Sequence, residues 1–452
     1  METSMHPNAK AAKRSLLSTL ALSLALVATI GTAHGAGFAI YETDARGFAM
    51  ANANVGRNDD ASALYSNPAA ITQLPGFQIK AGLSFIMPDI DVSTKGSIDG
   101  TYLNTEWRKT PMNSYTAVIP NLYGTYRIND NMAVGMGIFV PYGLKSDFPE
   151  FANAWPGAYN NYYTEIETVE MAPTFAYRLV HDQPWAKSLS VAVGLAILRT
   201  DITIKRQVNL ALMEEDTAYG SHYSPLILEG DDWEFGYNFA IQYEVNDNLA
   251  FGIVYRSGFD TKITGASARI LPNNQAGYAG RSGGKAWGKI DLPDSWSFGV
   301  NYSPVAPLNI GFQALRTNWG SYDELKIQAF PGEPGKVGEV TTSEKHWKDV
   351  WRYSLGAEYQ LNNALALRAG FVIDKDPVNT KYADYMVPSN DRQIFSTGLG
   401  WRISKAVTLD FAYGYIKIKE STFNARPREG VLETKVHTGH AHIFSASIAC
   451  RF

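Results

Sequence analysis

Apolar and polar side chains alternate in several segments of this chain. In residues 237–245, YNFAIQYEV, the large apolar side chains fall on odd positions, and residues 364–372 and 444–452 repeat the pattern. A period of two residues predicts β-strands that each have one apolar face. A soluble β-sandwich and a membrane-spanning barrel both show this alternation, so the pattern alone leaves both architectures open.

The spacing of the turns favours one of these architectures. Short polar turns are expected at 128–130, 181–188, 245–248, 303–307, 361–363 and 404–406, and longer connections near 91–113, 145–165, 207–231, 266–286, 330–347, 376–390 and 419–439. Six turns and seven connections predict fourteen strands, provided that residues 308–330 form one long strand bent at Gly320. An even strand number with short turns at one rim and long loops at the other is typical of outer-membrane barrels. We therefore predict an all-β, 14-stranded antiparallel transmembrane barrel, closed because lipid offers unpaired backbone groups no partner.

The N-terminus and the composition agree with export. Residues 1–35 contain a basic stretch, the apolar run LLSTLALSLALVATI and small residues before Gly35, which predicts a signal peptide cleaved after that glycine. Cys450 is the only cysteine of the 452 residues, so no internal disulfide is expected. A formal net charge of −4 argues against a nucleic-acid partner.

One irregular stretch precedes the first predicted strand. Residues 59–76, DDASALYSNPAAITQLPG, contain the tripeptide Asn67, Pro68 and Ala69. Proline cannot donate to a strand ladder, and it biases the residue before it towards extended conformations. The stretch is therefore predicted to be an irregular, non-strand segment, and is either an entry loop or a working part of the barrel.

Several segments resemble the FadL family of outer-membrane transporters of hydrophobic compounds. They are AGFAIYETDARGFAMANANVGRNDDASALYSNPAAIT, LPDSWSFGVNYSP and VPSNDRQIFSTGLGWRISKAVTLDFAYGYIK. The resemblance implies a hatch domain over residues 36–76 that plugs a barrel over residues 77–452, with the Asn-Pro-Ala tripeptide inside the barrel. It also implies transport of long-chain fatty acids or other apolar compounds by diffusion.

The third strand carries a candidate gate. Pro141 and Gly143 interrupt the otherwise regular segment AVGMGIFVPYGLKSDF, where proline removes a ladder donor and glycine indicates a bulge or close approach. The resemblance implies an inward kink at Gly143 that contacts the hatch and opens the wall sideways. The alternative is that Pro141 simply ends the membrane part of the strand.

Candidate ligand-binding residues lie in two kinds of segment. The connection 147–163 concentrates aromatics, including Phe148, Phe151 and Trp155, and the resemblance implies an external apolar groove there. Aromatic packing without ligand contact is the alternative. A fatty acid also requires a cation for its carboxylate. The resemblance points to Lys345 and, with an uncertain register, to Lys205 or Arg206. Solvated charges at the rim are the alternative.

A late acidic pair is a second candidate element of the gate. The resemblance implies that Asp374, Asp376 and Arg392 lie inside the barrel near the start of the hatch. The freed α-amino group of Ala36 could pair with these carboxylates and link ligand occupancy to hatch position. An ordinary ion pair between strands is the alternative.

Other function classes are less well supported. No G-x-S-x-G motif is present and the histidines near the last strand have no metal-ligand spacing, so we expect no enzyme, no cofactor and no metal site. A general porin has no use for a hatch. The expected partners are a hydrophobic small molecule, outer-membrane lipid and lipopolysaccharide, and the barrel-assembly machinery, and the expected state is a monomer. We favour long-chain fatty acids as cargo, with neutral aromatic hydrocarbons as the alternative.

Overall fold

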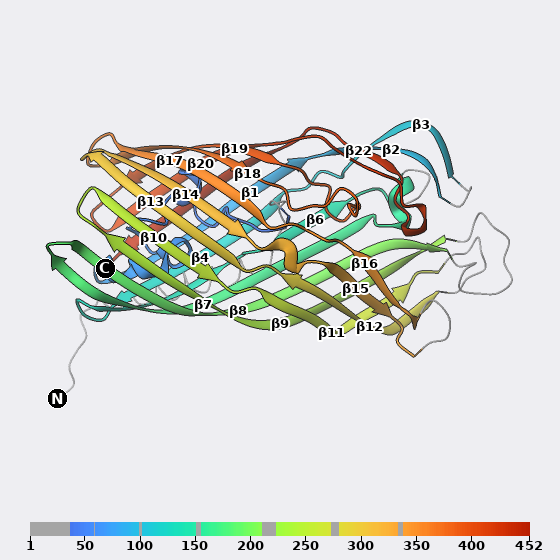
Figure 1. Cartoon of the computed structure of the whole chain (residues 1–452), viewed down its shortest axis with the longest axis horizontal. Coiled ribbons are helices and arrows are strands. Elements are labelled where there is room, and N and C mark those ends of the chain that lie inside the picture. Colours follow the sequence, from blue (N-terminus) through green and yellow to red (C-terminus); the bar gives the residue numbers. More distant parts are fainter. Residues whose placement is uncertain are drawn as a thin grey trace, which may run out of the picture.

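The structure, a computed structural model, describes residues 37–57, 59–98, 102–150, 155–209, 223–272, 280–332 and 338–452. Its main feature is a long antiparallel barrel, closed because the last strand, β23 (Gly439–Arg451), pairs with β1 (Phe77–Asp89), which pairs in turn with β4 (Ala117–Arg127). Short turns gather at one end of the barrel and the longer connections at the other (Figure 1). The predicted signal peptide lies outside the described residues.

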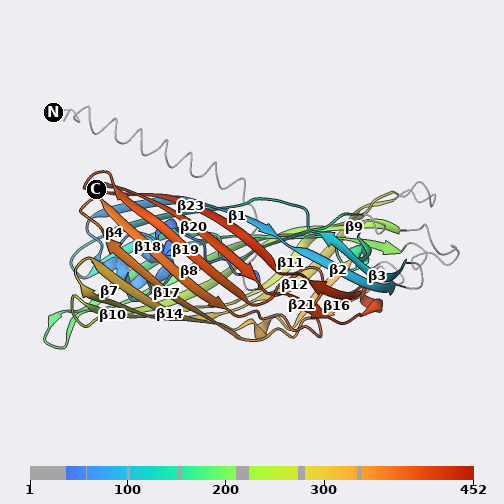
Figure 2. The same cartoon turned by 90° about the horizontal axis from the view of Figure 1, so that it is seen from above.

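The remaining barrel strands follow in chain order. They are β5 (Met132–Phe139), β6 (Gly143–Asp147), β7 (Tyr163–Gln183), β8 (Ala186–Asn209), β9 (Tyr223–Glu244), β10 (Leu249–Arg256), β11 (Phe259–Ile270), β12 (Arg281–Leu292), β13 (Ser295–Val305), β14 (Leu308–Thr317), β15 (Glu324–Ala329), β16 (Val340–Glu344), β17 (Val350–Gln360), β18 (Leu365–Asp374), β19 (Arg392–Arg402) and β20 (Val407–Ile418). A small outer sheet contains β2 (Asp91–Ile98), β3 (Tyr102–Pro111), β21 (Ser421–Phe423) and β22 (Glu433–Val436), seen beside the long connections in Figure 2. Short 3-10 helices are η2 (Pro156–Tyr159), η4 (Trp319–Ser321) and η6 (Pro427–Glu429).

Five positions around the barrel are occupied by two successive strands in line, which gives fourteen positions in all. These pairs are β5 with β6, β10 with β11, β12 with β13, β14 with β15, and β16 with β17. The predicted strand number is confirmed. The segment 308–330 is one such position, interrupted by η4 around Gly320.

The alternation along the strands separates lipid from lumen. Tyr237, Phe239 and Ile241 of β9 are between 44% and 51% exposed, whereas Asn238 and Gln242 on the opposite face are each 1% exposed. Apolar side chains therefore face outward and polar ones inward, the reverse of a soluble sandwich and the arrangement of a membrane barrel. Among the described residues, no helix is both long and apolar enough to cross a membrane.

The segment before β1 forms a plug inside the barrel. It contains α2 (Ala45–Ala49), α3 (Ala63–Ser66) and the 3-10 helix η1 (Pro68–Gln73), with nearly every described side chain buried. Asn67 explains the irregular tripeptide, because its Oδ1 accepts from Ala69 N at 3.1 Å and its Nδ2 donates to Val55 O and to Ile241 O of the wall. Pro68 begins η1, where its missing N–H costs nothing. The motif thus caps a helix and attaches the plug to β9.

Glycines on the inner wall allow the plug to approach closely. A Cβ atom on Gly311 would lie 1.7 Å from the carbonyl oxygen of Ala53, and one on Gly356 would lie 2.1 Å from that of Met50. Glycine is required here because backbone meets backbone. These inward glycines were not identified from the sequence, although they occupy inward positions of the alternation.

We expect Gly356→Val to unseat the plug. The Cβ atom and two methyl groups of valine would enter space held by the Met50 carbonyl, and such overpacking costs about 1–3 kcal/mol or more. The expected result is a folded barrel with a large single-channel conductance in planar bilayers. Gly124→Val on β4 is the matched control, because a Cβ atom added there would have no atom within 4 Å apart from Gly124 itself and its two neighbours along the chain. Equal conductance in the two variants would contradict a tightly seated plug.

Candidate functional site

The strand at the third barrel position bulges between β5 and β6, and residues 140–142 are here called the kinked segment. Between β5 and β6, the residues Val140, Pro141 and Tyr142 stand opposite only Thr168 and Val169 of β7. The hydroxyl of Thr168 fills the mismatch, because it accepts from Tyr142 N at 3.0 Å and donates to Tyr142 O at 2.6 Å. Proline fits this bulge since no ladder donor is needed there.

The kinked segment pairs with the plug. Ile40 N donates to Pro141 O, and Gly143 N donates to Phe38 O, both at 2.8 Å. Ala39 and Tyr142 form an isolated antiparallel bridge between these two bonds. The start of the plug therefore occupies the hydrogen-bonding edge that a continuous strand would offer to a neighbour.

The barrel ladder is interrupted beside this kink. β4 pairs with β5 only as far as Leu122 and Ile138, and among the described residues no ladder pair joins residues 117–121 of β4 to β6. A groove of about 580 Å³ lies at this level. Its mainly apolar lining includes Pro120, Leu122, Phe139, Val140 and Val169. The wall thus has a gap in its backbone pairing that faces apolar surroundings.

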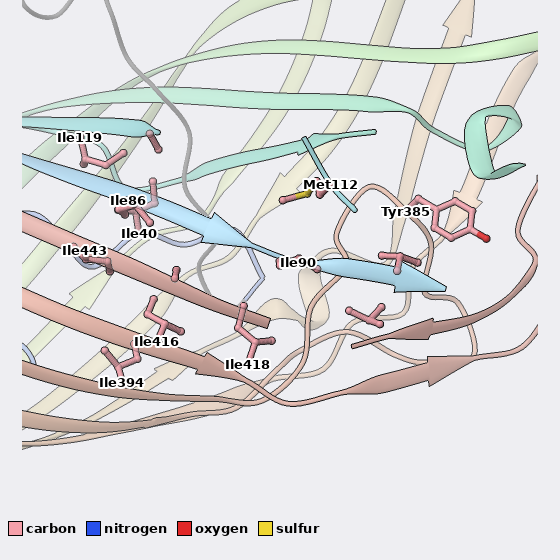
Figure 3. Close-up of a cluster of buried hydrophobic side chains, with 14 of the residues drawn as sticks. Ile40, Ile86, Ile90, Met112, Ile119, Tyr385, Ile394, Ile416, Ile418 and Ile443 are labelled. Atoms are coloured by element: carbon pink, nitrogen blue, oxygen red, sulfur yellow. The ribbon is translucent and has the colours of Figure 1, made fainter. Parts of the chain in front are cut away.

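Two apolar clusters in the interior combine side chains of the plug and of the wall. The β1-side cluster includes Ile40, Ile86, Ile119, Val140, Ile416 and Ile443, and Figure 3 shows its isoleucines along the strands with Tyr385 at the far end. The β7-side cluster includes Phe38, Tyr142, Leu198, Ile204, Trp319 and Trp347. The kinked segment separates the two, with Val140 in the first and Tyr142 in the second. Apolar side chains therefore extend from the interior to the kinked segment beside the gap.

Lys345 lies against the β7-side cluster. It lies between β16 and β17, and its side chain is only 4% exposed. Its ammonium forms an ion pair with Asp384 and lies 3.7 Å from the sulfur of Met386. Lys345 is therefore a buried cation, not a solvated rim charge, and its partner comes from the connection between β18 and β19.

The other two basic candidates point in different directions. Lys205 of β8 holds its ammonium 4.3 Å from the ring centroid of Tyr163, on the outward face. Arg206, the next residue, shares the inward face with Ile204 by strand alternation. The register that the sequence left uncertain therefore gives Arg206, and not Lys205, the inward position.

Two of the three candidate aromatic residues are buried near the outer end. The rings of Phe148 and Trp155 stack at a centroid distance of 4.3 Å, and Trp155 meets Tyr385 edge-on at 4.7 Å. Both are at most 1% exposed. Phe151 lies outside the described residues. The pair belongs to the β1-side cluster, where Trp155 contacts Tyr385.

Asp374 and Asp376, the late acidic pair, lie in different environments. Asp374 is buried between Arg352, at 2.9 Å, and Arg392, and the guanidinium of Arg352 lies 4.4 Å from the ring centroid of Tyr41 in the plug. Asp376 lies beyond the strand, where burial raises its pKa to about 6. Only Asp374 thus belongs to the cluster that contacts the plug through Arg352. Ala36, whose amino group was expected here, lies outside the described residues.

Comparison with known proteins identifies the family. The family model described as outer membrane protein transport protein (OMPP1/FadL/TodX) matches residues 24–452. The chain belongs to this family. The long-chain fatty acid transport protein of Escherichia coli O6:H1 is 28% identical over 421 residues, covering 88% of this chain and 90% of that protein. The 47 kDa outer membrane protein of Pasteurella multocida is 26% identical over 450 residues, covering 98% and 100%.

Solved structures of the family share the fold. A FadL homologue of Pseudomonas aeruginosa has a TM-score of 0.76 at 20% identity, covering 92% of this chain and 99% of that one. The toluene transporter TodX of Pseudomonas putida has a TM-score of 0.66 at 15% identity, covering 89% and 98%. Members of this family are outer-membrane transport channels for hydrophobic compounds and not enzymes, which confirms the resemblance seen in the sequence.

A buried ionic network in this FadL-family chain was not identified from the sequence. Lys80 of β1, with no exposed surface, contacts Asp44 and Asp60 of the plug, the latter at 2.8 Å. Arg46 of the plug pairs with Glu358 of β17 at 3.0 Å. Arg368 links Glu358 to Asp410 of the wall at 2.6 and 2.7 Å. The signal was available, because Lys80 and Arg368 are charged residues at inward positions of alternating strands.

Proposed function

We propose that this transporter carries long-chain fatty acids and releases them sideways through the gap beside the kink between β5 and β6. The observation that carries the proposal is the missing pairing between β6 and residues 117–121 of β4, where the strand edge is held by the plug instead. The apolar groove at the gap supports it. An apolar solute that leaves here enters the bilayer without crossing the plug.

The cargo is proposed from Lys345 and from named relatives. A buried ammonium beside an apolar cluster suits a molecule with one carboxylate and a long chain. The Escherichia coli relative bears the name of a long-chain fatty acid transport protein, which supports the same cargo. A neutral cargo is the second candidate, because Asp384 already neutralises Lys345. TodX, of similar fold, is named a toluene transporter.

Binding to detergent-purified protein tests the cargo. We expect Lys345→Ala to weaken binding of a C18 fatty acid about tenfold or more, because the solute carboxylate loses its cation and also meets Asp384, which is left buried without a counter-charge. Toluene binding should be unchanged. Lys348→Ala, three residues along and exposed, is the matched control and should leave both affinities as in the wild type. Binding of toluene alone, indifferent to Lys345, would instead establish the neutral cargo.

A further inference from the structure

The connection between β18 and β19 places the carboxylate of Asp384 in the interior, beside Lys345. Residues 379–387, here called the strap, carry Asp384, whose side chain is 5% exposed. One oxygen of Asp384 accepts from Met386 N at 3.1 Å, and the other forms the ion pair with Lys345. Tyr322 and Trp347 of the β7-side cluster lie on the same side of the barrel. Lys345 is therefore paired with a carboxylate of the protein itself.

We propose that the Asp384 carboxylate occupies the position at Lys345 that a solute carboxylate would take. An anionic solute must therefore displace Asp384 in order to bind, which lowers its affinity. This inference rests on the proposed function. A fatty acid gains its ion pair with Lys345 only by replacing Asp384, whereas a neutral apolar solute enters the cluster without disturbing the pair. Asp384 is thus a specificity-determining residue that selects between the two cargo classes.

The physical reason is the cost of a buried charge without its partner. An ion pair can offset the desolvation of both groups, but one member left alone is strongly destabilising. When a solute carboxylate takes Lys345, Asp384 retains only the backbone amide of Met386 and must move towards water. The net binding free energy that an anionic solute gains is therefore the difference between its ion pair with Lys345 and the ion pair of Asp384 with Lys345. This difference is much smaller than the free energy of a new ion pair.

The strap is also connected to the kinked strand. Ser146 of β6 donates to Met386 O at 2.7 Å, two residues from Asp384. Tyr385, between them, packs on Trp155 and accepts from Leu432 N at 3.0 Å. Movement of Asp384 away from Lys345 therefore pulls on β6, which adjoins the gap in the wall. Anionic and neutral solutes are then expected to differ in their effect on the strap.

Equilibrium binding of oleate and of oleyl alcohol to the full-length protein in detergent tests the inference. Asp384→Asn removes the competing charge with little change in shape, and we expect oleate to bind about tenfold more tightly while oleyl alcohol stays within about twofold. Asp384→Glu keeps the competing carboxylate and should behave as the wild type. Asp391→Asn is the matched control, since this acid of the same connection pairs with Lys375 and Lys419 instead.

The outcomes separate this inference from the proposed function. If the wild type binds oleate and Asp384→Asn binds it no more tightly, the proposed role of Asp384 is overturned while fatty-acid binding stands. If the wild type binds no oleate, both fail. If Asp384→Asn does not fold, as judged by loss of the heat-dependent shift in gel mobility, hydrogen exchange of the strap in the wild-type protein tests the inference instead. Oleate should then deprotect amides of residues 379–387 and oleyl alcohol should not, and equal protection with both solutes would overturn the inference.

Discussion

Deletion of Pro141 is expected to abolish most fatty-acid uptake while leaving a folded, plugged barrel. The deletion places two residues opposite Thr168 and Val169 where three stand now, so β5 and β6 become one continuous strand. That strand can then pair with residues 117–121 of β4 and close the gap. We expect uptake of labelled oleate to fall about tenfold or more, because a closed ladder has no unpaired section through which a solute can pass.

Uptake by cells that lack their own transporter, compared with oleate binding in detergent, is the measurement. Binding should survive, since Lys345 lies elsewhere. Deletion of Leu179 is the matched control, because it removes a bulge of β7 close to its turn with β8, where Arg178 and Val180 pair with Ser190 and Leu189. That variant should transport normally. Normal uptake by a folded Pro141 deletion would exclude exit through this gap.

Replacement of Lys80 by methionine is expected to release the plug. The ammonium lies between Asp44, Asp60 at 2.8 Å and Asp410 at 3.8 Å, in a place with no exposed surface. Removing one partner of a buried ion pair costs about 3–5 kcal/mol, because the remaining carboxylates lose their counter-charge in a site that water does not reach. We expect Lys80→Met to show a porin-like single-channel conductance and a lower urea midpoint.

The control for this experiment is a lysine of the surface. Lys187 pairs with Asp247, but the two side chains are 45% and 83% exposed, and pairs of this kind contribute little to stability. Lys187→Met should leave conductance and urea midpoint unchanged. A closed channel in Lys80→Met would show that the glycine-lined wall holds the plug without the ionic network.

Local pattern determined the architecture of this protein. Alternation in segments such as residues 237–245, together with the turn spacing, predicted a 14-stranded barrel. The reason is that one face of each strand contacts lipid and the other the interior, so apolar and polar residues alternate along it. The interruption of the third strand at Pro141 and Gly143 was also predicted from the residues themselves, since a missing backbone donor is a property of one residue, whereas the inward kink was implied by the resemblance to the family. The place of Lys345 came from the resemblance to the family.

Pairing across the fold was decided only by the tertiary structure. Lys345 and Asp384 lie 39 positions apart, and Lys80 and Asp410 lie on β1 and β20, which flank β23 only when the barrel closes. The gap beside β4 depends on the pairing of the plug with the strand edge between β5 and β6. The inward glycines are required only because carbonyl groups of the plug approach them closely. The alternation within one strand shows which of its faces is buried. It does not show which charge or carbonyl lies opposite, because that partner comes from a distant segment that is brought close only in the closed, plugged barrel.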